Sequence, residues 1–109
     1  STNPYRNHIV EFENKQISLI KEVVNKEDNK NADSIKSKYG LAPYILYNQY
    51  PTSTFNLYVY PKNGIAYLGH EDGTLLEIWY FKPIEIEEFI NKWGKGYGKE
   101  KPKFPPKGY

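Results

Sequence analysis

The chain has 109 residues, of which 17% are aromatic and 26% are charged, and its formal net charge is +2. This length suits one hydrophobic core and is too short for two. The small net charge does not provide the basic face that nucleic-acid binders usually carry, so we expect no DNA or RNA partner. The sequence contains no cysteine, which excludes disulfides, thiolate nucleophiles and Cys-ligated metal centres.

No apolar run approaches the ~18 residues that a membrane-spanning helix needs, so we expect a soluble chain without a transmembrane segment. The sequence also contains no Met. Removal of an initiator Met before Ser1 is routine in the cytoplasm, but a processed, exported protein would lack it too. By a narrow margin, the absence of Met favours an extracytoplasmic location, in the periplasm or cell envelope, over the cytoplasm.

The first predicted element is a helix. Asn3 followed by Pro4 is typical of a helix start, with a capping side chain and then a proline in the first turn. The apolar residues that follow fall within about half of a helical circumference at ~100° per residue, which predicts one amphipathic helix over residues 4–25. These apolar residues are Ile9, Val10, Phe12, Ile17, Leu19, Ile20, Val23 and Val24.

A short second helix and then a sheet are expected after a polar break. Asp33 or Ser34 can cap this helix, which ends at Tyr39 with Gly40 in the following position. The sequence then changes to Tyr, Leu and β-branched residues separated by turn formers, which predicts a four-stranded antiparallel meander. We expect its strands near Tyr44–Asn48, Thr54–Tyr60, Ile65–Leu68 and Thr74–Phe81.

Pro83 is expected to open a C-terminal helix, because apolar residues after it recur at i, i+3, i+4 and i+7. Residues 94–109 hold four Gly, three Pro and five Lys, a composition that predicts an irregular basic tail. The predicted fold class is therefore α+β, with an N-terminal helix, a short second helix, the meander, a C-terminal helix and the tail. We place the single domain at residues 1–93 and the tail at 94–109.

Hairpin geometry predicts which strand residues share a face, because paired residues lie on the same side of a sheet. A two-residue loop at Asn63–Gly64 would pair Tyr60 with Tyr67, and a three-residue loop in the next hairpin would pair Leu68 with Leu76. The core face then holds Leu57, Val59, Leu68, Leu76 and Ile78. The opposite face holds the candidate binding residues, Tyr58, Tyr60, Tyr67, Glu77 and Trp79.

An aromatic face of this size needs a cover or a partner, because contiguous apolar surface of several hundred Å² is unusual on a soluble monomer. In one interpretation the chain covers the face itself, with the tail residues 97–109 or with the helix near residues 31–39. In the other the face is a platform for a partner, since Tyr and Trp supply large contact areas at a small cost in side-chain entropy. The sequence leaves both interpretations open.

One compact polar cluster, His70–Glu71–Asp72, lies directly before Gly73. Adjacent side chains on a turn diverge, and Asp-Gly is itself a turn sequence, so we interpret this cluster as a hairpin turn rather than a metal or acid–base site. Phosphate-binding loops, nucleophile elbows and zinc-protease motifs are all missing from the sequence. We therefore expect no catalytic residues, no metal and no cofactor.

Small size, missing catalytic motifs, the aromatic face and the basic tail together favour a non-enzymatic protein-binding module. We expect its partner to be another protein, as for a small bacterial immunity-type or enzyme-inhibiting protein. One alternative is an extracytoplasmic ligand- or glycan-binding protein that stacks its ligand on Trp79 and neighbouring tyrosines. The other alternative is a small hydrolase.

Overall fold

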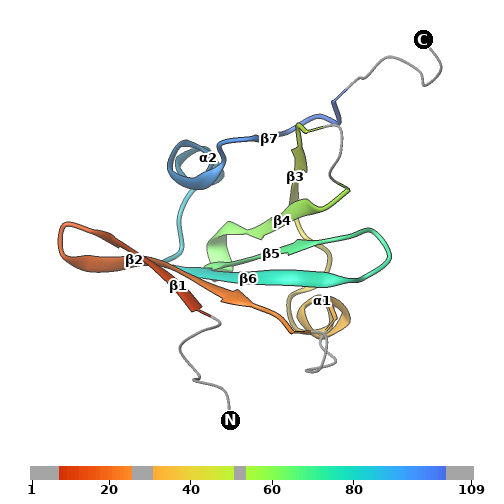
Figure 1. Cartoon of the computed structure of the whole chain (residues 1–109), viewed down its shortest axis with the longest axis horizontal. Coiled ribbons are helices and arrows are strands. Elements are labelled where there is room, and N and C mark those ends of the chain that lie inside the picture. The colour runs from red at the N-terminus through yellow and green to blue at the C-terminus, as the bar shows by residue number, and fades with distance from the viewer. Residues whose placement is uncertain (1–7, 26–30, 51–53, 103–109) are drawn as a thin grey trace.

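The computed structural model describes residues 8–25, 31–50 and 54–102. They form a seven-stranded antiparallel sheet and two helices, in the strand order β1-β2-β6-β5-β4-β3-β7 (Figure 1). The strands are β1 His8–Glu13, β2 Gln16–Val23, β3 Tyr44–Asn48, β4 Asn56–Tyr60, β5 Ile65–Gly69, β6 Leu75–Phe81 and β7 Tyr97–Gly98. The helices are α1 Asp33–Tyr39 and α2 Ile86–Trp93.

The predicted N-terminal helix is wrong, because this part of the chain forms the hairpin β1–β2. The expected helix start at Asn3–Pro4 lies outside the described residues. Asn14 and Lys15 connect the two strands and both have positive φ, 52° and 66°, which is typical of a two-residue type I′ turn. This turn matches the right-handed twist of the strands it joins.

A β-bulge explains why the segment resembles a helix in sequence. Glu11 pairs with Leu19 and Phe12 pairs with Ile17, so Ser18 is an extra residue in β2. The bulge therefore brings Ile17 to the same face as Ile20, at a spacing of three residues. That spacing is the one that an amphipathic helix would show.

The four-stranded meander is also wrong as a description of the sheet, because β1 and β2 extend it at one side and β7 at the other. The expected C-terminal helix does not match either: α2 begins at Ile86 rather than at Pro83, and β7 follows it. Since Tyr97 in β7 pairs with Asn48 and packs against the core, the tail is not irregular throughout. Residues 103–109 of that tail lie outside the described residues. The fold is mostly β.

The two helices cover opposite faces of the sheet (Figure 1). The core beneath α2 consists of Leu19, Leu46, Leu57, Val59, Ala66, Leu68, Trp79 and Phe89. The core that includes α1 consists of Ala32, Ile35, Tyr60, Ile65, Tyr67, Leu75 and Ile78. The short second helix is confirmed: α1 ends at Tyr39, and Gly40 follows with a φ of 81°, a conformation that favours glycine.

The loop between β4 and β5 is longer than the two residues predicted. Pro61–Asn63 form a single 3₁₀ turn, and Gly64 follows with a φ of 68°. As a result Tyr58, rather than Tyr60, lies opposite Tyr67. A register shift of two residues keeps every side chain of this hairpin on its predicted face.

Strand β6 faces the other way from the prediction. A bulge beside Leu68 pairs that residue with Glu77, so Trp79 lies on the α2 face and Ile78 is buried on the α1 face, while Leu76 is exposed. The Glu77 carboxylate accepts a hydrogen bond of 2.8 Å from the indole N–H of Trp79. This bond offsets the cost of placing a carboxylate beside apolar side chains.

Phe89→Ala is expected to destabilise the protein by about 3–5 kcal/mol, as is typical of large-to-small substitutions in a core. The Phe89 ring is fully buried and contacts the rings of Trp79, Phe81 and Trp93. Phe12→Ala is the matched control, since this ring is exposed, and it should change stability by no more than about 0.5 kcal/mol. Urea unfolding measures both variants, and equal losses would contradict the described core.

Candidate functional site

The five predicted binding residues do not form one surface. Tyr58, Tyr60 and Tyr67 lie on the α1 face of the sheet, whereas Glu77 and Trp79 lie on the α2 face. Tyr60 and Tyr67 are each 1% exposed and Trp79 is 4% exposed. A partner could therefore not reach these three rings without a rearrangement of the fold.

The three tyrosines connect the sheet to α1. The rings of Tyr58 and Tyr67 are stacked, with centroids 4.7 Å apart, and the Tyr60 ring lies 5.7 Å from that of Tyr39. The Tyr60 hydroxyl donates a 2.8 Å hydrogen bond to the Gly40 carbonyl. Burial raises the pKa of both Tyr60 and Tyr67, as expected for phenols that are held away from water.

Accessible apolar surface lies instead on the β1–β2 hairpin and the adjoining end of β6. We call the residues on this surface the hairpin patch: Val10, Phe12, Ile17, Ile20 and Tyr80. Four of them are between 39% and 67% exposed, and Ile20 is half-buried. A shallow depression of about 380 Å³ next to β6 is lined by Ile17, Ile20 and Tyr80 together with Pro83.

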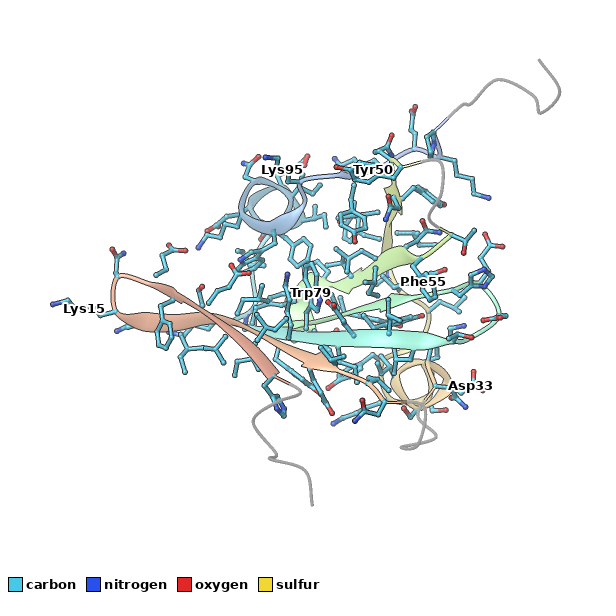
Figure 2. All side chains as sticks on the ribbon, viewed as in Figure 1. Lys15, Asp33, Tyr50, Phe55, Trp79 and Lys95 are labelled. Atoms are coloured by element: carbon cyan, nitrogen blue, oxygen red, sulfur yellow. The ribbon has the colours of Figure 1, made fainter. Side chains whose placement is uncertain are left out.

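Strand pairing places the hairpin patch on the α1 side of the sheet. A cross-strand row runs from Val10 through Ile20, Tyr80 and Ile65 to Tyr60. The Tyr60 end of this row is buried beneath α1, whereas Tyr80 and Val10 are 40% and 39% exposed. Figure 2 shows Asp33 of α1 and Lys15 of the hairpin turn at opposite sides of the molecule. Helix α1 therefore covers one end of this face and leaves the other uncovered.

The other face of the hairpin buries Leu19 in the core and carries charged residues that contact α2 and β6. Lys92 of α2 lies 3.1 Å from the Glu13 carboxylate, and Lys21 lies 3.8 Å from that of Glu11. The Lys21 ammonium also lies over the Trp79 ring, 4.3 Å from its centroid. The pairing of β2 with β6 and the burial of Leu19 determine which way the hairpin faces, so the uncovered apolar side is built into the fold.

A metal site and a membrane-spanning helix find no support in the residues that the structure describes. Within them, no group of three or more His, Asp or Glu side chains could hold a metal ion. None of the described helices is both long and apolar enough to cross a membrane.

Comparisons with protein-family models, with curated proteins and with solved structures found no match to this chain. The geometry of the chain is therefore the sole support for the proposals below.

Sequence reasoning missed the hairpin patch because it placed Val10, Phe12, Ile17 and Ile20 in a helical stripe. One signal could have located it. Asn14 separates two runs rich in β-branched residues, and Asn is among the few residues that readily adopt a positive φ.

Tyr80, at the β6 edge of the hairpin patch, is expected to ionise with a pKa of about 12. Burial is the main cause, and the Glu22 carboxylate, which accepts a 3.0 Å hydrogen bond from the Tyr80 hydroxyl, adds to it. Because the unfolded phenol has a pKa of ~10, the contribution of Tyr80 to stability is complete below pH 10 and is lost as the pH rises toward 12.

The phenolate absorbance of the native chain, minus that of Tyr80→Phe, isolates this titration. Glu22→Gln should lower the pKa of Tyr80, since it removes the negative charge beside the hydroxyl. A difference titration centred near pH 10 in the native chain would contradict the described environment of Tyr80.

Proposed function

We propose that this chain is a non-enzymatic protein-binding module that docks on its partner through the hairpin patch. The observation that carries the proposal is the cluster of five apolar side chains on one uncovered sheet face beside an edge strand. An apolar surface of this kind on a monomeric protein usually marks an interaction site. Burial of exposed apolar area supplies about 25 cal/mol per Å², so Phe12 and Ile17 offer the largest gains.

The edge strand adds a second means of recognition. β1 ends the described sheet on one side, and its outer edge is not paired with another strand there. Natural proteins usually protect such edges, because exposed backbone groups can pair with a further strand. A partner strand could add to β1 and cover Val10 and Phe12 in the same contact, which is a recurring form of protein recognition.

More specifically, we propose that the chain is a small immunity-type or enzyme-inhibiting protein. The support for this proposal is the shape of the molecule, because the hairpin turn projects beyond both helices (Figure 1). A projecting hairpin with one apolar face suits insertion into a concave site on a larger protein. A bacterial origin and an extracytoplasmic location remain predictions from the sequence.

A double substitution, Phe12→Ser with Ile17→Ser, is expected to weaken binding of the partner by at least about tenfold, or about 1.4 kcal/mol. Gln16→Ser is the matched control, since Gln16 is exposed on the same hairpin and lies outside the patch. Affinity capture from host extract with the native chain and both variants identifies the proteins that depend on the patch. Thermal melting checks that each variant remains folded.

Titration calorimetry with the purified partner then measures the loss. A partner that binds the double variant as tightly as the native chain would contradict docking through the patch. If that partner is an enzyme, the inhibitory form predicts that adding the native chain lowers its activity and that the double variant does not.

A further inference from the structure

A second depression lies at the end of the sheet away from the hairpin turn. Tyr50 and Thr54 from the described ends of the β3–β4 loop, the β5–β6 turn and the segment after β7 line it, and its volume is about 270 Å³. We call it the polar pocket. Its main lining residues are Tyr47, Asn48, Tyr50, Asn56, His70 and Glu71. We propose that the polar pocket binds a neutral carbohydrate, independently of the hairpin patch.

Aromatic rings supply the apolar part of the pocket. Tyr47 lies on β3, and Tyr50 follows in the next loop with 65% of its surface exposed. A sugar ring presents C–H groups on its faces and hydroxyl groups around its rim. Tyrosine suits such a ligand, because its ring contacts the C–H groups while its hydroxyl offers a hydrogen bond. The volume is slightly below the ~300–1,000 Å³ of pockets for drug-sized molecules, so it suits one or two small rings.

Hydrogen bonds hold the polar side chains in place before a ligand arrives. The Asn48 side-chain oxygen accepts a 2.9 Å bond from the Tyr50 backbone N–H, and the Asn56 oxygen accepts a 3.1 Å bond from the Asn48 backbone N–H. Nδ1 of His70 lies 3.2 Å from the backbone nitrogen of Asp72, so Nε2 is the ring nitrogen that remains for a ligand. Such preorganisation lowers the entropy cost of binding.

The charges of the pocket cancel. Lys101 lies 3.8 Å from the Glu71 carboxylate, and its ammonium also lies 5.8 Å from the Tyr47 ring centroid. A site for phosphate or carboxylate would instead need unopposed cationic groups or converging backbone N–H groups. One cation paired with one anion favours a neutral ligand, whose hydroxyl groups can meet both the ammonium and the carboxylate.

The same residues favour binding over cleavage. Glycoside hydrolysis generally uses two carboxyl groups, one on each side of the scissile bond. Among the residues that line the pocket, Glu71 is the only carboxylate. The nearby Asp72 carboxylate accepts a 2.8 Å hydrogen bond from the Thr74 backbone N–H and contacts His70, as a turn residue does.

Titration of the ¹⁵N-labelled full chain with cellobiose, lactose and N,N′-diacetylchitobiose tests the proposal, with glucose 6-phosphate as the anionic probe. At least one neutral disaccharide should give saturable amide shifts confined to the pocket. Tyr50→Ala should weaken that binding at least tenfold. Tyr44→Ala, an exposed tyrosine of the same strand region outside the pocket, should leave it unchanged.

Two results would overturn the proposal. One is the lack of saturable shifts with all three neutral disaccharides, and the other is tighter binding of glucose 6-phosphate than of any of them. Glu71→Gln leaves Lys101 without its carboxylate, so it should strengthen binding of glucose 6-phosphate. The Phe12→Ser, Ile17→Ser variant should bind the sugar as the native chain does, which separates this proposal from the one for the hairpin patch.

Discussion

The short reach of α1 over its face of the sheet determines which apolar side chains on that face are buried and which stay exposed. Seven strands at a spacing of ~4.8 Å make a sheet about 29 Å wide. A helix of seven residues is ~10 Å long and about as wide, so it covers roughly a third of that width in any orientation. Tyr60 and Tyr67 lie under it, whereas Val10 and Tyr80 on the same side lie beyond it.

The opposite face is covered more completely, although α2 is only one residue longer. Large aromatic side chains explain the difference, because Trp79, Phe81 and Trp93 surround Phe89 and fill the space that a longer helix would occupy. Tyr97 of β7 extends this cover at the far edge of the sheet. One ion pair, between Lys92 and Glu13, links the hairpin to α2. The two proposed binding sites follow from this asymmetry, since both lie where neither helix reaches.

The sequence predicts this fold only in part, and the limit has a physical cause. Alternation of apolar and polar residues shows where strands run, and Gly40 shows where α1 ends. Both signals depend only on neighbouring residues, so the sequence alone reveals them. Bulges are different. One extra residue moves every later side chain of the strand to the opposite side of the sheet, and it leaves little trace in the sequence. The bulge at Ser18 made a hairpin look like a helix, and the bulge beside Leu68 turned Trp79 to the other side.

The candidate site was misplaced for a related reason. The sequence predicted that an aromatic sheet face would be either covered by the chain or left open for a partner. On this sheet one part of the face is covered by α1 and another part is left uncovered. The tyrosines predicted as a platform are covered by α1, and the residues that remain open were assigned to a buried helical stripe. The predicted pairing of Leu68 with Leu76 also placed Glu77 on the face opposite the core. In the structure Glu77 does pair with Leu68, but its side chain is only partly buried and its carboxylate is bonded to Trp79, which offsets the cost of placing a charge there. The electrostatic rule failed because the sequence shows neither how much of a charged side chain stays exposed nor which donor it will meet.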